Sequence, residues 1–277
     1  MKRAAVRDNL PAMTGREDSA VRRPDLDTSR PNIARVYDYW LGGKDNFDAD
    51  RAEAERLLNI YPELRRLAWE NRMFTRRAVG WLAAECGIRQ FLDIGSGLPT
   101  ATNTHEVAQA AAPGSKVAYV DKDPVVVMHA DALLADGHDV IAVRGDAAAP
   151  ASILADARVN ALFQPGRPYA ILLAAVLHFF SLADAGRVIT ELAGLAPPGS
   201  YLVISVGSSG SRLAREYAAG TLHDHSPDDI RSLLTGLEII DPPGLVDALH
   251  WAPDTPAPAP AKPNGHILAA VARFPGS

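Results

Sequence analysis

The sequence contains very little cysteine, no long apolar segment and no excess of positive charge. Cys86 is the only cysteine among 277 residues, so the chain cannot form an intrachain disulfide, which fits a reducing compartment. The longest apolar run, from Tyr169 to Leu177, is too short to span a bilayer. The segment from Met1 to Asp18 is charged throughout and has no apolar stretch of the kind found in secretory signals. We therefore expect a cytoplasmic protein without a membrane segment.

The charge balance also argues against one class of partner. A formal net charge of -5 gives no electrostatic reason to expect binding to nucleic acid. Hydrophobic residues make up 47% of the chain, enough to bury a substantial core. The length suits one large α/β domain with an extension, or two small domains.

The first part of the chain changes character near residue 31. Residues 1–30 are polar, rich in Arg, Asp and Pro, and lack a regular period, which predicts a flexible N-terminal arm. Apolar residues then recur at helical spacing over 33–40, and a Gly-Gly pair follows. Further helices are predicted over 48–87, with a break at Pro62. We expect 31–87 to form a helical cap or lid on the rest of the chain.

From Ile88 onwards, short apolar runs alternate with helical or loop segments. Five strands are predicted, in the stretches QFLDIG, KVAYVDKD, DVIAVRGD, PYAILLAAVL and GSYLVISVG. This alternation predicts a parallel sheet with crossover helices on both faces, as the core of a domain over 88–277. Two late strands, LEIID and HILAAVARF, have no helix between them and favour an antiparallel pair closing the edge of the sheet. A Pro/Ala-rich linker, 252–265, separates the two late strands.

The stretch LHDHSPDD contains two histidines and three aspartates, which raises the question of a metal site. Ser226 and Pro227, followed by Asp228 and Asp229, form a strong helix-start signal. That signal already explains most of the polar residues, so we expect no metal site.

The stretch FLDIGSGLPTATNTHEV places two glycines directly after a buried strand. Gly95 and Gly97 would let the backbone approach a ligand closely, with the N-terminus of the next helix pointing at it. Pro99 follows where dinucleotide folds use a third glycine for tight packing. This difference argues against the interpretation of the chain as an NAD-dependent oxidoreductase. Asp93 lies in the otherwise apolar strand, where a carboxylate costs several kcal/mol unless it is paired. It would bond the amides of the turn or orient a cationic ligand.

Acidic residues also end the next two predicted strands. Asp121 is placed to accept hydrogen bonds from a ribose diol, or else to cap the following helix. Asp146 is placed to bind an adenine amino group, or else simply starts a loop. Three acids beside a glycine turn favour a nucleoside without phosphates. A positively charged adenosyl sulfonium fits such a site better than NAD does.

The motifs LDIGSG, VDKDP and GDA resemble those of class I S-adenosylmethionine-dependent methyltransferases. More specifically, IARVYDYWLGGKDNFDADR, FLDIGSGLPTATNTHEVAQ, VAYVDKDPVV and VLHFF resemble an actinobacterial methyltransferase family formerly catalogued as a domain of unknown function. The resemblance covers about residues 30–275. It implies a Rossmann-like α/β fold, with a seven-stranded, mostly parallel sheet, one antiparallel strand and a helical N-terminal cap. It also implies that the cofactor is S-adenosyl-L-methionine, but it does not supply the methyl acceptor.

The predicted cofactor-binding residues lie in the glycine turn, at the strand ends and in the cap. The segment YDYWLGGKDNF is interpreted as a lid near the sulfonium or amino-acid end, or alternatively as a helix with core aromatics. Arg72 would hold the methionyl carboxylate, or else belong to a solvated helix face. The predicted set comprises Tyr37, Asp38, Arg72, Asp93, Gly95, Ser96, Gly97, Asp121, Lys122, Asp146, Ala147 and Ala175.

The sequence leaves the catalytic step open. His178 follows the fourth predicted strand and could act as a general base for an O–H or N–H nucleophile, line the pocket or cap a helix. We predict methyl transfer to a small-molecule acceptor. The alternative is a non-catalytic sensor or partner protein that binds S-adenosylmethionine or S-adenosylhomocysteine. The sequence does not determine the oligomeric state.

Overall fold

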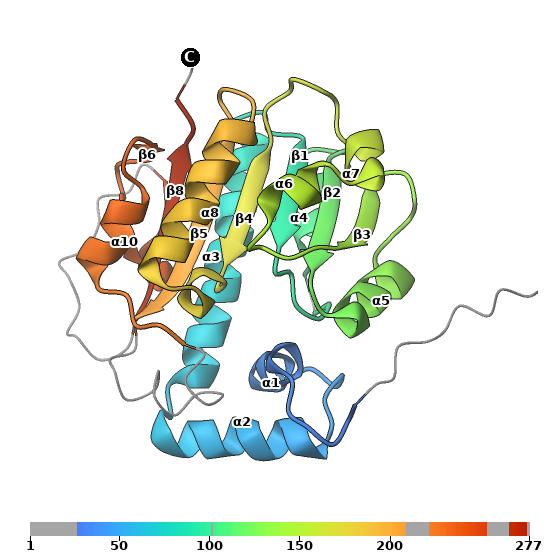
Figure 1. Ribbon diagram of the computed structural model, residues 1–277, viewed down its shortest axis with the longest axis vertical. Helices are drawn as coiled ribbons and strands as arrows, with labels where there is room; N and C mark the ends of the chain where they lie inside the picture. The colour runs from blue at the N-terminus through green and yellow to red at the C-terminus, as the bar shows by residue number, and fades with distance from the viewer. Residues whose placement is uncertain (1–26, 101, 209–221, 254–265, 276–277) are drawn as a thin grey trace, which may run out of the picture.

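The computed structural model describes residues 27–100, 102–208, 222–253 and 266–275, and a mixed eight-stranded sheet lies at its centre (Figure 1). The order along the sheet is β3-β2-β1-β4-β5-β8-β6, and β7 pairs with β8 beside this path. The strands are β1 Gln90–Ile94, β2 Lys116–Asp121, β3 Val140–Arg144, β4 Ala170–Ala174, β5 Tyr201–Ser208, β6 Glu238–Ile239, β7 Val246–Asp247 and β8 His266–Arg273.

The first five strands are parallel because each is buried on both faces and returns through a crossover. All residues of β1 are buried, and Leu92 lies opposite Ala118 on one side and Ile171 on the other. β8 runs antiparallel to both β5 and β6, as the sequence predicted for the late strands. β8 lies between them and β6 is the outermost strand of the path, so this antiparallel pair closes the edge of the sheet beyond β5. The predicted mostly parallel α/β sheet is confirmed, with the two-residue β7 as an additional strand.

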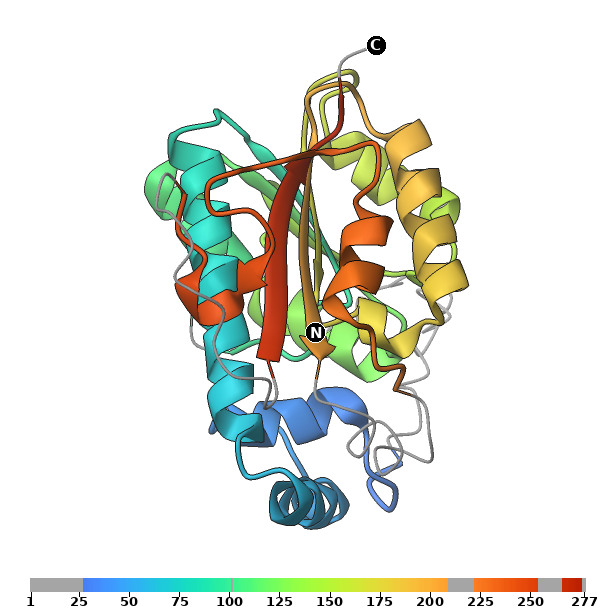
Figure 2. The ribbon, with the colours of Figure 1, turned by 90° about the vertical axis from the view of Figure 1, so that its left-hand side faces the viewer.

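Helices cover both faces of the sheet (Figure 2). One face packs against α3, α4 and α5, and the other against α6, α7, α8 and α10. The α-helices are α1 Ile33–Trp40, α2 Asp48–Ile60, α3 Leu64–Ala84, α4 Thr104–Ala111, α5 Pro124–Leu133, α6 Pro150–Leu154, α7 Ala157–Leu162, α8 Leu182–Leu195 and α10 Pro227–Leu233. Two 3-10 turns, η1 Leu177–Phe179 and η3 Ala248–His250, complete the described helical elements. None of the described helices is long and apolar enough to cross a membrane.

Helix α3 connects the N-terminal helices to the sheet. Its second half is buried in the core of the sheet, where Phe74, Val79 and Leu82 are almost fully inaccessible. Its first half extends beyond the sheet (Figure 1), and there Leu64 and Ala68 pack into a small cluster with α1 and α2. The same helix therefore supports both parts of the molecule.

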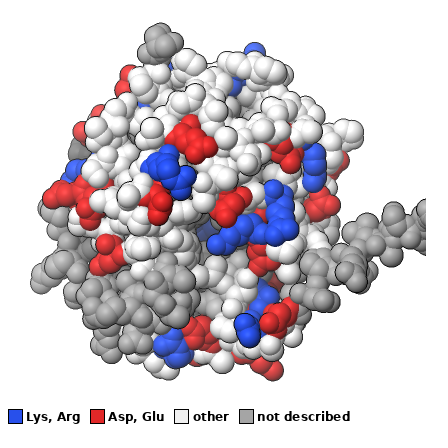
Figure 3. Space-filling view, viewed as in Figure 1, with Lys and Arg blue, Asp and Glu red and all other residues white. Residues whose placement is uncertain are grey.

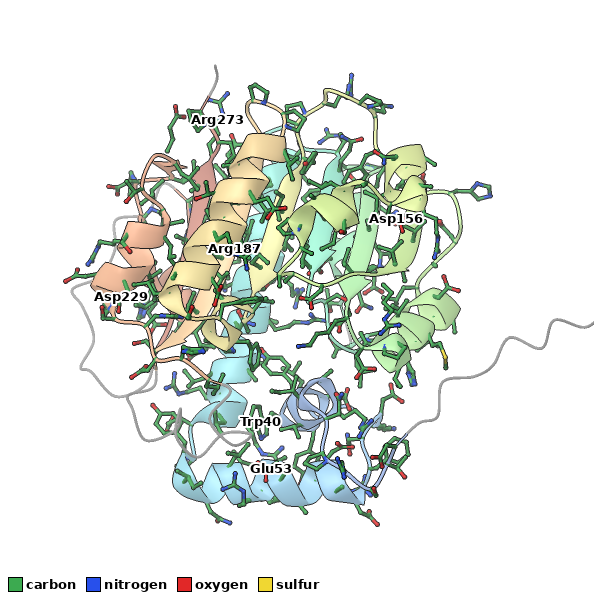
Figure 4. All side chains as sticks on the ribbon, in the orientation of Figure 1. Trp40, Glu53, Asp156, Arg187, Asp229 and Arg273 are labelled. Atoms are coloured by element: carbon green, nitrogen blue, oxygen red, sulfur yellow. The ribbon has the colours of Figure 1, made fainter. Side chains whose placement is uncertain are left out.

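Helices α1 and α2 form a unit at the end of the sheet where the parallel strands terminate (Figures 1 and 2). Trp40 lies between the two helices (Figure 4), and its indole N–H donates to the Ala54 carbonyl over 3.4 Å. Arg35 and Asp50 are both buried and form an ion pair at 2.7 Å. Because a buried charge is tolerated only when it is paired, this ion pair fixes α1 against the start of α2.

The predicted helix start at residue 226 is confirmed. Ser226 Oγ accepts from the Asp229 N–H over 3.1 Å, and Asp229 Oδ2 accepts from the Ser226 N–H over 2.9 Å. The predicted arm lies almost wholly outside the described residues, as do residues 254–265 of the predicted Pro/Ala linker.

Candidate functional site

The turn after β1 is held against β2 by its own backbone. The N–H groups of Gly95 and Ser96 both donate to the Val120 carbonyl, over 2.7 and 3.1 Å. Gly95 has φ +71°, and a Cβ there would lie 2.6 Å from a methyl of Val176, so no larger residue fits. Gly97 has φ +66°, but a Cβ there would meet nothing within 4 Å among the described residues. The side of the turn at Gly97 is therefore open to a ligand.

The carboxylate of Asp121, at the end of β2, is tied to this turn. Its Oδ2 accepts from the Gly97 N–H over 3.1 Å, and its Oδ1 accepts from the Asp123 N–H over 3.0 Å. Burial raises the pKa of Asp121, and these two hydrogen bonds oppose the rise. Each carboxylate oxygen can accept a second bond, so the group can still take two ligand hydroxyls.

Asp93 lies inside β1 with only 7% of its surface exposed. Its Oδ2 accepts from Thr104 Oγ1, at the start of α4, over 2.6 Å. The sequence suggested that Asp93 bonds either the amides of the turn or a cationic ligand. In the structure the turn amides bond Val120 and Asp121 instead of Asp93. Burial raises the pKa of Asp93, while the Thr104 bond and the charge of Arg72 oppose the rise.

Arg72 extends from α3 toward the same turn. One terminal N–H donates to Thr100 Oγ1, and its charge opposes the rise that burial causes in the pKa of Asp93. Its Nε atom is buried and has no hydrogen-bond partner among the described residues. An unpaired buried donor costs about 1–3 kcal/mol, so this position suits an acceptor supplied by a ligand.

The end of β4 has an unusual backbone conformation. Ala175 has φ +58°, a left-handed conformation that costs a non-glycine residue about 1–2 kcal/mol. Its N–H donates both to the Ser205 carbonyl, over 3.0 Å, and to Ser205 Oγ, over 2.8 Å. The turn is therefore fixed by the neighbouring strand β5, at the edge of the sheet where ligands bind in such folds.

His178 lies in η1, immediately after this turn. Its Nδ1 accepts from the Gly207 N–H over 3.3 Å. Burial, with a smaller contribution from the nearby His225, lowers the pKa of His178 to about 4. The imidazole is therefore neutral at physiological pH, and its remaining proton is on Nε2.

The two predicted lid residues on α1 are both hydrogen-bonded within the protein. The Tyr37 hydroxyl donates to the Ala68 carbonyl over 3.2 Å and accepts from Asn71 Nδ2 over 2.9 Å. Asp38 is buried, and its Oδ2 accepts from the Asp45 N–H and from the Asn46 side chain, over 3.0 and 2.9 Å. The structure thus places Asp38 against the loop that follows α1.

Helix α1 crosses the edge of the sheet between two anchor points. At its start, Asn32 Nδ2 donates to Asp123, the residue that caps α5 just after Asp121. Further along, Tyr37 bonds Asn71, next to Arg72 on α3. In the space-filling view, a recess bordered by basic and acidic side chains lies near the middle of the face, above the position of α1 (Figure 3).

The remaining predicted residues lie at the ends of β2 and β3. Asp146 is exposed, and its Oδ1 accepts from the Ala148 N–H over 2.9 Å. Ala147 is half-buried against the core, and Lys122 is exposed. The structure therefore gathers Arg72, Asp93, the glycine turn and Asp121 around the ends of β1 and β2, with Asp146 at the next strand end. The described residues hold no group of three side chains suited to bind a metal ion.

Three polar contacts at this edge were missed from the sequence. Ser205, Thr104 and the Asn32–Asp123 contact all support site residues. Only Ser205 gave a signal that could have been used, as a single hydroxyl in the otherwise apolar run LVISV.

Comparison with known proteins agrees with this geometry. The family model for S-adenosyl methyltransferases matches residues 19–275. The chain belongs to the S-adenosyl methyltransferase family. A crystal structure of a candidate methyltransferase from Thermobifida fusca YX is 39% identical with a TM-score of 0.83, covering 93% of this chain and 100% of that one. A DUF574 family protein from Streptomyces avermitilis MA-4680 is 37% identical with a TM-score of 0.81, covering 90% and 99%. No curated protein matches the chain.

The residues present suit the cofactor of this family, S-adenosylmethionine. An adenosyl sulfonium with an amino-acid tail has ribose hydroxyls, a carboxylate and positive charge. The edge of the sheet offers a carboxylate with free acceptor capacity in Asp121, an unpaired donor in Arg72 and a buried acid in Asp93. The predicted family, fold and cofactor are therefore confirmed.

Proposed function

We propose that this chain transfers the methyl group of S-adenosylmethionine to a small-molecule acceptor at the ends of β1, β2 and β4. The observation that carries the proposal is the unpaired, buried Nε of Arg72 beside the acid-flanked glycine turn. In this arrangement Asp121 binds the ribose hydroxyls and the open side of Gly97 takes the close approach of the nucleoside. Asp146 lies at the next strand end, within the region expected to receive the adenine.

The amino-acid end of the cofactor would lie toward α3. Arg72 is the natural partner of its carboxylate, because a guanidinium N–H without a partner gains a charge-assisted hydrogen bond there. Burial raises the pKa of Asp93, and a ligand cation, either the ammonium or the sulfonium, would oppose that rise and favour the ionised carboxylate. The buried Asp93 and the half-buried Arg72 can thereby orient both ends of a zwitterion.

The chemistry of the transfer places modest demands on the protein. The bound sulfonium supplies an already activated methyl group, so the chain's residues mainly orient the reactants and exclude water. Helix α1 spans the edge between Asp123 and Asn71, which supports its role as a lid. We propose that α1 and α2 form this lid and that an acceptor entering beside them is small.

The position of His178 supports hydrogen-bond donation better than proton removal. Because Nδ1 already accepts from the Gly207 N–H, the neutral ring has its proton on Nε2. A general base needs a free lone pair at the atom that faces the acceptor. We therefore propose that His178 orients the acceptor by donating from Nε2, and that an acceptor with an easily lost proton is used.

The experiment that tests this proposal is a label-transfer screen. The purified protein is incubated with methyl-labelled S-adenosylmethionine and a fractionated small-molecule extract, and labelled products are identified by mass spectrometry. An Arg72→Met variant serves as control, and we expect label transfer with the wild type only. Binding of the cofactor without transfer to any fraction would support the non-catalytic sensor instead.

A further inference from the structure

We propose that Ser205 and Asn71 are positioning residues that couple the lid helix α1 to the strained turn at Ala175. The inference rests on the proposed function, because it assigns these residues to the amino-acid end of the same cofactor site. Neither side chain is assigned to the reaction itself. Both act through a hydrogen-bond chain that crosses from β4 to α1.

The chain is continuous and the direction of each bond is fixed. The Ala175 N–H donates to Ser205 Oγ over 2.8 Å, and the Ser205 hydroxyl donates to Asn71 Oδ1 over 2.5 Å. Asn71 Nδ2 then donates to the Tyr37 hydroxyl over 2.9 Å, and that hydroxyl donates to the Ala68 carbonyl over 3.2 Å. The Ala175 N–H keeps its second bond, to the Ser205 carbonyl, if the Ser205 hydroxyl is removed, whereas Asn71 Oδ1 then loses its donor. Removing the Tyr37 hydroxyl likewise leaves Asn71 Nδ2 without its acceptor.

The burial of the central links makes those losses costly. Ser205 is fully buried in a strand that is otherwise apolar at its centre, and Asn71 is 5% exposed. A buried polar group that loses its partner is penalised far more than an exposed one. Water cannot easily replace the missing partner, so Tyr37, Asn71 and Ser205 should respond to substitution as a unit.

The two ends of the hydrogen-bond chain hold two different elements, the turn after β4 and helix α1. One end fixes the left-handed backbone of Ala175, directly after β4. The other end holds α1 through Tyr37, and the central Asn71 precedes Arg72 on α3. The position of the lid, the turn after β4 and the guanidinium of Arg72 are therefore set together. We therefore expect the closure of α1 over the cofactor to be coupled to the binding of the methionyl end.

A double-mutant cycle between Tyr37→Phe and Ser205→Ala tests this coupling. The two side chains belong to different elements and are joined through Asn71, so independent sites would give additive effects. We expect each single variant to weaken S-adenosylhomocysteine binding. The fold-loss of affinity in the double variant should be smaller than the product of the two single fold-losses, by a factor of at least about three. Tyr39→Phe paired with Ser205→Ala is the matched control, because Tyr39 bonds the exposed Glu55. That pair should be additive.

A second ligand separates positioning from general damage. 5′-Methylthioadenosine lacks the amino-acid tail. Its affinity should therefore change by less than about two-fold in the same variants, which is the scatter expected for independent sites. Equal losses for both ligands, or an additive Tyr37–Ser205 cycle, would overturn the proposal. The same cycle in urea unfolding without ligand tests the chain itself and should also be non-additive. If the wild type bound neither ligand, the proposed function would fail while the unfolding cycle still decided the hydrogen-bond chain.

Discussion

The Gly97 N–H donates to Asp121 Oδ2 over 3.1 Å, so the glycine turn after β1 holds the carboxylate that ends β2. The turn and the acid are thereby one structural unit, although 23 residues of helix and strand separate them in the chain. Such a unit presents an acceptor and an open backbone surface side by side. It explains how a turn without a third glycine can still bind a nucleoside.

The first prediction concerns Asp121→Ala. Loss of two charge-assisted hydrogen bonds to the ribose, each contributing about 1.5–3 kcal/mol, should lower S-adenosylhomocysteine affinity roughly ten-fold or more. The fold should persist, because only the bonds to the Gly97 and Asp123 amides are lost inside the protein. Asp131→Ala, at an exposed position on α5, is the control for isothermal titration. Unchanged affinity in Asp121→Ala would remove the ribose assignment.

The second prediction compares Gly97→Ala with Gly114→Ala. Both glycines have positive φ, +66° and +79°, and a Cβ at either meets nothing within 4 Å of the described residues. The two changes should therefore cost a similar stability of about 1 kcal/mol in urea unfolding. Only Gly97→Ala should weaken the binding of S-adenosylhomocysteine, because its methyl fills the space left for the ligand. Equal affinities in the two variants would show that the turn does not approach the cofactor.

The third prediction concerns the pH dependence that His178 contributes. The pKa of His178 is lowered by burial to about 4, whereas an unfolded histidine titrates near 6.5. Between these values the unfolded chain binds a proton that the folded chain does not, so stability falls as the pH drops from about 6.5 to 4. His178→Gln keeps an acceptor for the Gly207 N–H and should flatten this part of the curve in urea unfolding. If His178 had an ordinary pKa in the folded protein, the stability of the wild type and of His178→Gln would change in parallel between these pH values, which would contradict the prediction.

The fourth prediction concerns the lid. A protein beginning at Glu63 removes α1 and α2 together and exposes mainly Leu64 and Ala68, so the sheet should still fold. A cut at residue 47 is less suitable, because it would leave Ala54 and Leu57 of α2 without their partners on α1. The shortened protein should bind S-adenosylhomocysteine weakly and show no methyl transfer. In the full chain, amide exchange over residues 36–47 should slow when this ligand is added.

A scaffold role for α1 and α2 predicts a different outcome. The protein beginning at Glu63 would then be insoluble, since the cluster around Leu64 and Ala68 would be needed for folding. Exchange over residues 36–47 would also be equally slow with and without ligand. That result would leave Tyr37 and Asp38 as structural residues only.

The strands of the sheet could be predicted from the sequence because each one corresponds to a local run of apolar residues. A run such as QFLDI is apolar throughout, and the residues of β1 are in fact buried on both faces. The helix start at Ser226 was equally clear, since its capping residues lie within four positions. The position of β8 between β5 and β6 could not be predicted, because the pairing of strands far apart in the sequence depends on packing that no local pattern shows.

The support of the site was harder to predict than its acids. Asp93 and Asp121 stood out as carboxylates in or after apolar strands, where an unpaired charge is costly. The unpaired Nε of Arg72 and the chain from Ser205 to Tyr37 depend on contacts between segments far apart in the sequence. Asp38 stays a prediction as a site residue, and the structure adds that its carboxylate accepts from the Asp45 N–H and the Asn46 side chain. Its partners lie across a turn whose shape the sequence did not define.

The most direct test of the account is calorimetric titration of the full chain with S-adenosylhomocysteine and with NAD under identical conditions. The acid-flanked turn, with Asp121 bound to Gly97 and no third glycine at Pro99, predicts tight binding of the adenosyl thioether and poor binding of NAD. Asp121→Ala in the same titration should lower the affinity for S-adenosylhomocysteine roughly ten-fold or more. Tight binding of NAD with no heat from S-adenosylhomocysteine would contradict the account.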